Sequence, residues 1–167
     1  KELAKSTADW PADFVLVFHT SHNVKDDEYF SEVVKNDYKN KVFFSTDPVK
    51  TDELDTLVCS ADIGIALYSR VILDYRAELL GLAAGKIGNY LKCGLPVIAT
   101  RLESFSYISD FECGILIDDE SEISNAIIKI KDKYDDFSNN ARNCYQELWE
   151  PERYLKKIKS HFENISI

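Results

Sequence analysis

Residues 85–100, GKIGNYLKCGLPVIAT, decide the fold class of this chain. Residues 86–93 have a helical pattern, and Gly94 follows at the end of the predicted helix. Residues 95–99 (LPVIA) are a continuous apolar run, which is typical of a strand covered on both faces. A helix that leads directly into a buried strand is the repeating unit of an α/β sheet.

The same alternation extends along the chain in both directions. Further strand-like apolar runs occupy residues 14–18 (FVLVF), 41–45 (KVFFS), 63–68 (IGIALY) and 114–117 (GILI). Further helical patterns occupy residues 26–38, 51–60, 121–134, 137–149 and 152–162. Parallel strands need crossover connections, and right-handed helical crossovers are the usual solution. We therefore predict an α/β fold, a Rossmann-like parallel sheet with helices on both faces.

The domain organisation is simple. Residues 1–167 contain no linker, internal repeat or low-complexity segment, so we expect a single domain. Residues 1–10 have a helical pattern that ends near Pro11, but no strand comes before them. The doubly wound pattern therefore begins inside its first βα unit, and we expect a first strand to be missing.

Composition and charge exclude several kinds of partner. The chain is 45% hydrophobic and carries a formal net charge of −9, which disfavours nucleic acid as a partner. The longest apolar stretches are strand-length, well short of the roughly 20 residues that a membrane span needs. Residues 1–13 also lack the apolar core of a secretory signal, and we expect a cytoplasmic protein.

The arrangement of the cysteines is also typical of a cytoplasmic protein. Cysteines stand at positions 59, 93, 113 and 144, far apart and without a C-x-x-C pair, and three of them fall inside apolar or helical patterns. We expect buried, reduced thiols, with Cys93 acting as a small apolar residue at a helix end. A disulfide between distant positions stays open as an alternative.

Ligands of open parallel sheets bind beyond the carboxyl ends of the strands, so the residues after each apolar run are candidates. They are His19, Ser45, Thr46, Tyr68 and the loop 80–86 (LGLAAGK), which enters a helix. A small-residue loop at a helix start presents free N–H groups and the positive end of the helix dipole, which suits a phosphate, and Lys86 adds a charge. Taken alone, such a loop is more often explained by packing and turn geometry.

Other candidates have structural explanations. His19 and His22 are three residues apart, but a zinc site needs a third ligand, and the sequence offers none nearby. Ser45 and Thr46 are as well explained by a turn that caps the next helix as by a ligand-binding role. The lysines near residues 156–159 fit a solvated helix face, and no Asp-x-Asp metal motif is evident.

A family resemblance strengthens the hypothesis that the loop at residues 80–86 binds a phosphate. GKIGNYLKCGLPVIAT, followed by GILI at residues 114–117, resembles the donor-binding helix and strands of retaining GT-B glycosyltransferases of the group 1 or family 4 type. In that family a small-small-Gly-Lys loop opens a helix of the form E-Y-L-x-x-G-x-P-V-I. Residues 53–68, which contain S-A-D-I-G, and residues 141–155, which contain A-R, W and Y, are similar to further family elements. The resemblance covers roughly residues 14–162, and it implies the C-terminal half of a GT-B fold.

The resemblance implies specific roles for the loop and the helix. The backbone of Ala84 and Gly85 and the side chain of Lys86 would hold the donor diphosphate. Asn89 stands where the family usually has a Glu that binds the ribose hydroxyls, a role that an amide can also fill. Gly81 stands where many retaining members have a Glu near the donor sugar, so the usual pair of glutamates is absent.

Four more residues fall near the expected nucleobase and sugar. Ser45 and Thr46 occupy the place where the family's backbone meets the base, and Tyr68 and His19 follow two other predicted strands. The resemblance implies metal-independent catalysis without a cofactor.

The implied function is transfer of a sugar from a UDP- or GDP-sugar to a saccharide or lipid-linked acceptor, in polysaccharide or glycan biosynthesis. The acceptor would be bound by an N-terminal domain outside this chain, and any peripheral membrane association would run through that half. Residues 152–167 would form a closing helix against it, and the 167 residues alone would be inactive. A non-catalytic nucleotide-binding scaffold and a sugar-nucleotide epimerase remain the alternatives.

Overall fold

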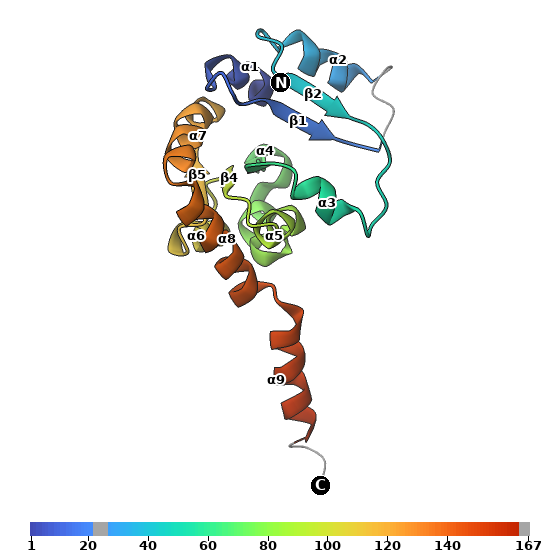
Figure 1. The fold of residues 1–167 in the computed structure, drawn as a ribbon, viewed down its shortest axis with the longest axis vertical. Helices are drawn as coiled ribbons and strands as arrows, with labels where there is room; N and C mark the ends of the chain where they lie inside the picture. Colours follow the sequence, from blue (N-terminus) through green and yellow to red (C-terminus); the bar gives the residue numbers. More distant parts are fainter. Residues whose placement is uncertain (22–26, 164–167) are drawn as a thin grey trace.

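The computed structural model describes residues 1–21 and 27–163 (Figure 1). Its strands are β1 Leu16–His19, β2 Val42–Ser45, β3 Gly64–Ala66, β4 Val97–Thr100 and β5 Gly114–Ile117. Each overlaps one of the predicted apolar runs, although β1 and β4 end one residue beyond them, and every strand pair is parallel. The α/β prediction with parallel strands is confirmed.

The strands form two small sheets. β1 pairs with β2 from Leu16 opposite Val42 to His19 opposite Ser45. β4 lies at the centre of the other sheet, in the order β3-β4-β5. The sequence predicted one continuous sheet, whereas β1 and β3 are not hydrogen-bonded to each other in the residues described.

The helices follow the predicted periodic segments, but α1, α2, α3 and α7 are shorter than predicted, and α8 and α9 are slightly longer. They are α1 Glu2–Ser6, α2 Glu28–Lys35, α3 Leu54–Val58, α4 Arg70–Leu73, α5 Gly85–Lys92, α6 Ser106–Asp110, α7 Ile123–Asp132, α8 Tyr134–Leu148 and α9 Pro151–Glu163. Short 3-10 turns are η1 Thr7–Asp9, η2 Asp74–Leu79, η3 Gly81–Ala83, η4 Glu103–Phe105 and η5 Glu120–Glu122. The sequence analysis missed α4, α6 and η2 to η4, because segments of three to six residues are too short to show a helical period.

Two apolar clusters cover the two faces of the β3-β4-β5 sheet. Val97 and Ala99 belong to the cluster formed with α5, α6 and α8, while Ile98 belongs to the cluster formed with α7, Trp10 and Leu16. Because successive side chains of a strand point to opposite faces, a strand buried on both faces needs a continuous apolar run. This explains why the run at residues 95–99 predicted the strand correctly.

Gly94 ends α5 as the sequence suggests. Its φ is +72°, and its N–H donates to the Leu91 carbonyl at 2.9 Å, while the Leu95 N–H reaches the Tyr90 carbonyl at 3.0 Å. A left-handed residue after the last helical turn is the common way to satisfy the terminal carbonyls. A Cβ at this position would also lie 2.5 Å from the Arg142 guanidinium carbon, so Gly94 fixes the turn from α5 into β4.

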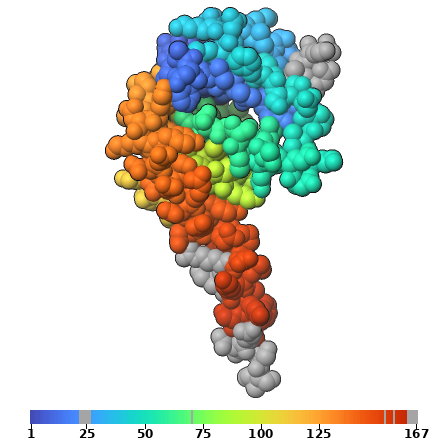
Figure 2. All heavy atoms as spheres, viewed as in Figure 1, coloured from blue at the N-terminus to red at the C-terminus, as the bar shows by residue number. Residues whose placement is uncertain are grey.

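The helix α9 projects away from the rest of the protein, as Figures 1 and 2 show. The predicted apolar stripe on it is exposed, at 43% for Tyr154, 61% for Leu155, 53% for Ile158 and 65% for Phe162. Ile165, the last member of the predicted stripe, lies outside the described residues. Of the helices described, none is both long and apolar enough to cross a membrane.

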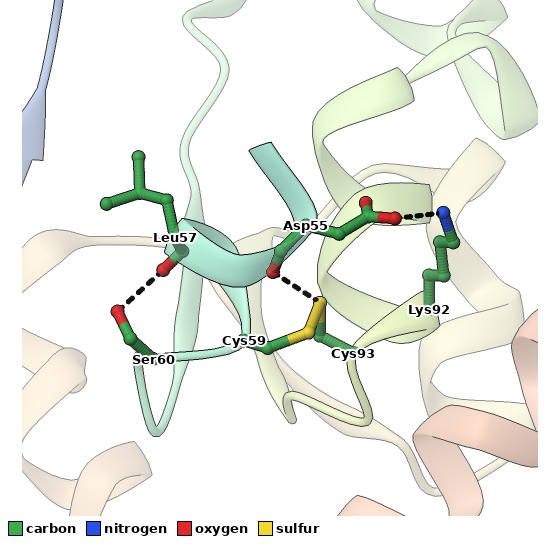
Figure 3. The surroundings of a disulfide bond; sticks show 6 residues. All are labelled: Asp55, Leu57, Cys59, Ser60, Lys92 and Cys93. Carbon is green, nitrogen blue, oxygen red and sulfur yellow. Dashed lines mark hydrogen bonds and ion pairs between the residues drawn. A yellow bond between two sulfur atoms is a disulfide. The ribbon is translucent and has the colours of Figure 1, made fainter. Parts of the chain in front are cut away.

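The cysteine prediction is half wrong. Cys59 and Cys93 form a disulfide, with their Cα atoms 5.0 Å apart (Figure 3). Cys113 and Cys144 are buried and free. Cys59 is exposed and Cys93 is half-buried, because they cap the C-terminal ends of α3 and α5 rather than facing the core. An ion pair between Asp55 and Lys92 joins the same two helices.

Candidate functional site

The N-terminus of α5 has free backbone donors. Ala84 is the N-cap residue, and no side chain caps the helix. The first bonds of the helix run from the N–H groups of Ile87 and Gly88 to the Ala84 carbonyl, at 2.8 and 3.4 Å. Within residues 1–21 and 27–163, the N–H groups of Gly85 and Lys86 have no acceptor. These are the groups that bind anions at helix starts.

The surroundings of this helix start leave room for a ligand. A Cβ built on Gly85 would meet no atom within 4 Å, and Gly85 and Lys86 are both exposed. In the part of the chain that the structure describes, no carboxylate pairs with the Lys86 ammonium group. The positive end of the helix dipole and an exposed lysine therefore both belong to the first turn of α5.

The helix α5 packs closely against the end of α8 and against β3. Gly88 lies against Trp149, because an added Cβ would be 2.9 Å from the indole nitrogen. That nitrogen donates to the Leu82 carbonyl at 3.2 Å and so ties the loop before α5 to the end of α8. Gly64 in β3 makes a similar close approach, where a Cβ would lie 2.3 Å from the Tyr90 ring. The sequence analysis missed this support, although a glycine inside a helix, such as Gly88, is a signal of close packing.

Asn89 lies on α5 three residues after Lys86, and both side chains are exposed. Residues three apart on a helix share a face, so the ribose candidate and the diphosphate candidate face the same side. The structure therefore brings Ala84, Gly85, Lys86 and Asn89 into one group.

Gly81 has a structural reason to be glycine. Its φ is +45°, a left-handed conformation in which a Glu would be strained. Glu78, the nearest glutamate, accepts a hydrogen bond from the Glu103 N–H at 3.1 Å and so holds the turn at η4. The absence of a Glu at this position thus coincides with a left-handed backbone conformation that favours glycine.

The residues at the ends of β1 and β2 form a second group. The His19 Nδ1 and the Ser45 Oγ are 3.1 Å apart, and the Thr20 N–H donates to the Ser45 carbonyl at 3.0 Å. Thr46 is exposed. The alternative that Ser45 and Thr46 cap the next helix is wrong, because α3 begins at Leu54 with Glu53 as its N-cap.

The histidine pair is only partly described, because His22 lies outside the described residues. Among the residues that the structure does describe, no three His, Cys, Asp or Glu side chains gather as metal ligands.

Tyr68 is a third element of the predicted site. Its N–H donates to the Thr100 Oγ1 at 2.8 Å, and its ring packs edge-on against Phe105 with centroids 5.4 Å apart. Burial raises the pKa of the Tyr68 hydroxyl. The sequence analysis quoted Thr100 only as the end of a motif, but its hydroxyl joins the carboxyl ends of β3 and β4.

His19 and Ser45 are the last residues of β1 and β2, and Tyr68 follows the end of β3 by two residues. In the structure, as far as it is described, no hydrogen bond or ion pair links the α5 group to His19, Ser45 or Tyr68. A surface pocket of about 440 Å³ lies elsewhere, beside β5, and its lining includes Arg101, Lys133 and none of the predicted residues. Because the α5 group combines free backbone donors with an exposed cation in one helical turn, we favour it over this pocket as the binding site.

Comparison with known proteins gives one family. Residues 30–160 match the family described as glucosyltransferase 3-like, C-terminal domain. The match includes the α5 group, Ser45, Thr46 and Tyr68, and it leaves His19 outside. No curated protein and no solved structure matches the chain.

Proposed function

Because the chain belongs to the glucosyltransferase 3-like C-terminal domain family, we propose that it binds the nucleoside-diphosphate sugar in a two-domain GT-B glycosyltransferase. In this proposal the enzyme is of the retaining, group 1 or family 4 type, and it transfers a hexose from a UDP- or GDP-sugar to a saccharide or lipid-linked acceptor. The name of the family favours glucose as the transferred sugar.

The N-terminus of α5 carries the proposal. The exposed N–H groups of Gly85 and Lys86, the open space above Gly85 and the Lys86 ammonium form a complement to a diphosphate. When the bond to the sugar breaks, negative charge grows on the leaving diphosphate. Donors and a cation that are already in position stabilise this charge without reorganising.

The remaining candidates have supporting roles. Asn89 would hold the ribose hydroxyls from the exposed face of α5. Ser45, Thr46, His19 and Tyr68 would lie toward the base and the sugar. Charge stabilisation by Lys86 and the helix start is consistent with our expectation that no metal is required.

The exposed stripe on α9 fits a contact with an N-terminal, acceptor-binding domain. Its apolar residues, including Leu155 and Phe162, would be covered in the intact enzyme. The cytoplasmic location remains part of this proposal, although the Cys59–Cys93 disulfide removes part of the argument for it.

A non-catalytic nucleotide-binding module is the second candidate. Gly81 and Asn89 both replace glutamates of the family pattern, and the backbone at Gly81 is in a left-handed conformation. A module of this kind would still bind nucleotide but would not transfer sugar.

Calorimetry and a transfer assay on the intact polypeptide test these functions. We expect UDP or GDP to bind more tightly than ADP, and we expect the corresponding sugar nucleotide to be turned over. Binding without turnover would favour the module, and binding of none of the three nucleotides would contradict a donor site at α5.

A further inference from the structure

We propose that Trp149 is a positioning residue for the donor diphosphate. Its indole holds the turn at residues 81–84 so that the N–H groups of Gly85 and Lys86 are in place before the ligand binds, and the indole itself does not touch the ligand. Trp149 follows α8 directly, and Figure 1 shows this end of α8 beside α5. The inference rests on the proposed function, because it concerns the same site.

The indole contacts both the turn and the helix that follows it. Its Nε1–H donates to the Leu82 carbonyl at 3.2 Å, two residues before the N-cap residue Ala84. A Cβ built on Gly88 would lie 2.9 Å from Nε1 and 3.1 Å from Cδ1, so the same edge of the ring lies against α5. The ring therefore fixes the turn relative to the first residues of α5.

Between its two packed ends, the turn is held by Trp149. Leu80 and Ala84 pack in the apolar cluster formed with α5, α6 and α8, whereas the side chain of Leu82 is 42% exposed. The turn itself is the 3-10 segment η3, and hydrogen bonds in such short segments have poor geometry. In the part of the chain that the structure describes, the bond from Trp149 is the only hydrogen bond that reaches residues 81–84 from outside residues 80–88.

Ala84 joins the turn to the donor groups. Its φ of −71° and ψ of 72° are not helical, so the chain changes direction at this residue. The peptide plane between Ala84 and Gly85 carries both the Ala84 carbonyl, which accepts the first bonds of α5, and the Gly85 N–H. Because this plane is rigid, the position of the turn relative to α5 determines where the Gly85 N–H points. Holding the turn in advance lowers the cost of ordering it when the ligand binds.

The indole is itself held in place. The Trp149 backbone N–H donates to the Tyr145 carbonyl at 2.8 Å, and the ring packs edge-on against Tyr107 with centroids 5.3 Å apart. At the corner between α8 and α9, the Tyr154 hydroxyl donates to the Leu148 carbonyl at 2.7 Å. A side chain positions a neighbour only when its own rotamer is fixed by packing and hydrogen bonds. Trp149 meets this condition.

The other tryptophan of the chain provides a matched control. The Trp10 Nε1–H donates to the Ser6 Oγ at 3.2 Å, the same distance as in the bond from Trp149. Trp10 is buried in the apolar cluster on the opposite face of the β3-β4-β5 sheet, away from α5. Trp10→Phe and Trp149→Phe therefore each remove one indole hydrogen bond and keep an aromatic ring, but only Trp149→Phe does so beside the α5 group.

Calorimetry with inorganic pyrophosphate tests the proposal on the intact polypeptide. A ligand that needs one arrangement of a turn binds more weakly when that arrangement is less populated, and loss of one hydrogen bond lowers such a population by up to about fivefold. We expect Trp149→Phe to raise the Kd for pyrophosphate by about three- to fivefold and Trp10→Phe to leave it unchanged. Thermal unfolding of both variants measures the accompanying loss of stability.

Two results would overturn the role of Trp149 and leave the proposed function standing. One is an unchanged Kd in Trp149→Phe. The other is an equal rise of the Kd in Trp149→Phe and Trp10→Phe, because an equal rise would come from a general loss of stability. If the unmodified protein binds neither pyrophosphate nor UDP nor GDP, the donor site at α5 is contradicted, and the role of Trp149 is contradicted with it.

The indole N–H signals give a second readout, which a purely structural role would not move. Each variant lacks one signal, which assigns the Nε1–H signals of Trp149 and Trp10 in a proton–nitrogen NMR spectrum. We expect pyrophosphate to shift the Trp149 signal with the Kd found by calorimetry, because the indole is bonded to the turn beside the bound anion, and to leave the Trp10 signal in place. Binding of pyrophosphate with an unmoved Trp149 signal would overturn the proposal.

Discussion

The disulfide between Cys59 and Cys93 should supply much of the stability of the α3–α5 connection. The helix α3 has five residues, and none of them is buried. Besides the disulfide, the Asp55–Lys92 ion pair joins α3 to α5, and exposed pairs of this kind contribute at most about 1 kcal/mol. Replacing Cys59 by Ser therefore removes the principal link between these helices.

The expected loss follows from the length of the closed loop. The two cysteines are 34 residues apart, and a loop of this length lowers the entropy of the unfolded chain by an amount worth about 3–4 kcal/mol at 25 °C. For a domain of this size, that corresponds to a fall in the unfolding midpoint of roughly 10 °C. The free energy of unfolding should be measured by urea denaturation of the oxidised protein, the Cys59→Ser variant and the Cys93→Ser variant.

Reductant provides the control. A dithiol should lower the stability of the oxidised protein to that of Cys59→Ser and should leave the variant unchanged. Thiol titration of the denatured, unreduced protein should find two free thiols, those of Cys113 and Cys144. Four free thiols, or a stability that does not respond to reductant, would refute the reasoning.

Three further predictions concern single side chains. Tyr107→Phe should stabilise the protein by about 1 kcal/mol, because the buried Tyr107 hydroxyl has no hydrogen-bond partner among the described residues. Tyr90→Phe is the control and should not stabilise the protein, because it removes a hydroxyl that donates to the Ile65 carbonyl. Equal effects of the two substitutions in urea denaturation would contradict this prediction. The hydrogen bond from Lys131 lowers the pKa of the Asp13 carboxyl. The contribution of this pair to folding stability is therefore present above the unfolded pKa of Asp13 and is lost as pH falls below about 4. The acid loss of stability should be smaller in Asp13→Asn, and identical pH profiles of the two proteins would contradict the assignment. Asn89→Ala should weaken donor binding by about 1 kcal/mol in calorimetry, and a 2′-deoxyribose donor that binds as well as the ribose form would rule out Asn89 as the ribose contact.

The strands were predictable because burial on both faces leaves a direct trace in the sequence. The runs at residues 95–99 and 114–117 are apolar at every or nearly every position, since both faces of β4 and β5 pack against helices. Gly94 was equally informative, because few residue types other than glycine adopt the left-handed conformation at a helix end. These features are enough to predict α5 and its N-terminal loop from the amino-acid sequence alone.

Other features leave no comparable trace in one sequence. The disulfide depends on the ends of α3 and α5 meeting in space, which spacing along the chain does not reveal. The contact of His19 with Ser45 depends on the register of β1 with β2. The division into two sheets depends on which strands pair with each other, and local periodicity carries no information about pairing.

The central claim is that the N-terminus of α5 binds the donor diphosphate, and one titration tests it most directly. Calorimetry with UDP and GDP should compare the intact protein with its Lys86→Ala and Lys129→Ala variants. Lys129 is an exposed lysine on α7, so its replacement makes the same change in net charge away from the site. We expect Lys86→Ala to weaken binding of the preferred nucleotide by about 1.5–3 kcal/mol, roughly 10- to 150-fold in Kd, and Lys129→Ala to leave it unchanged. A Kd that is the same in Lys86→Ala as in the unmodified protein would contradict the claim and move the diphosphate site elsewhere.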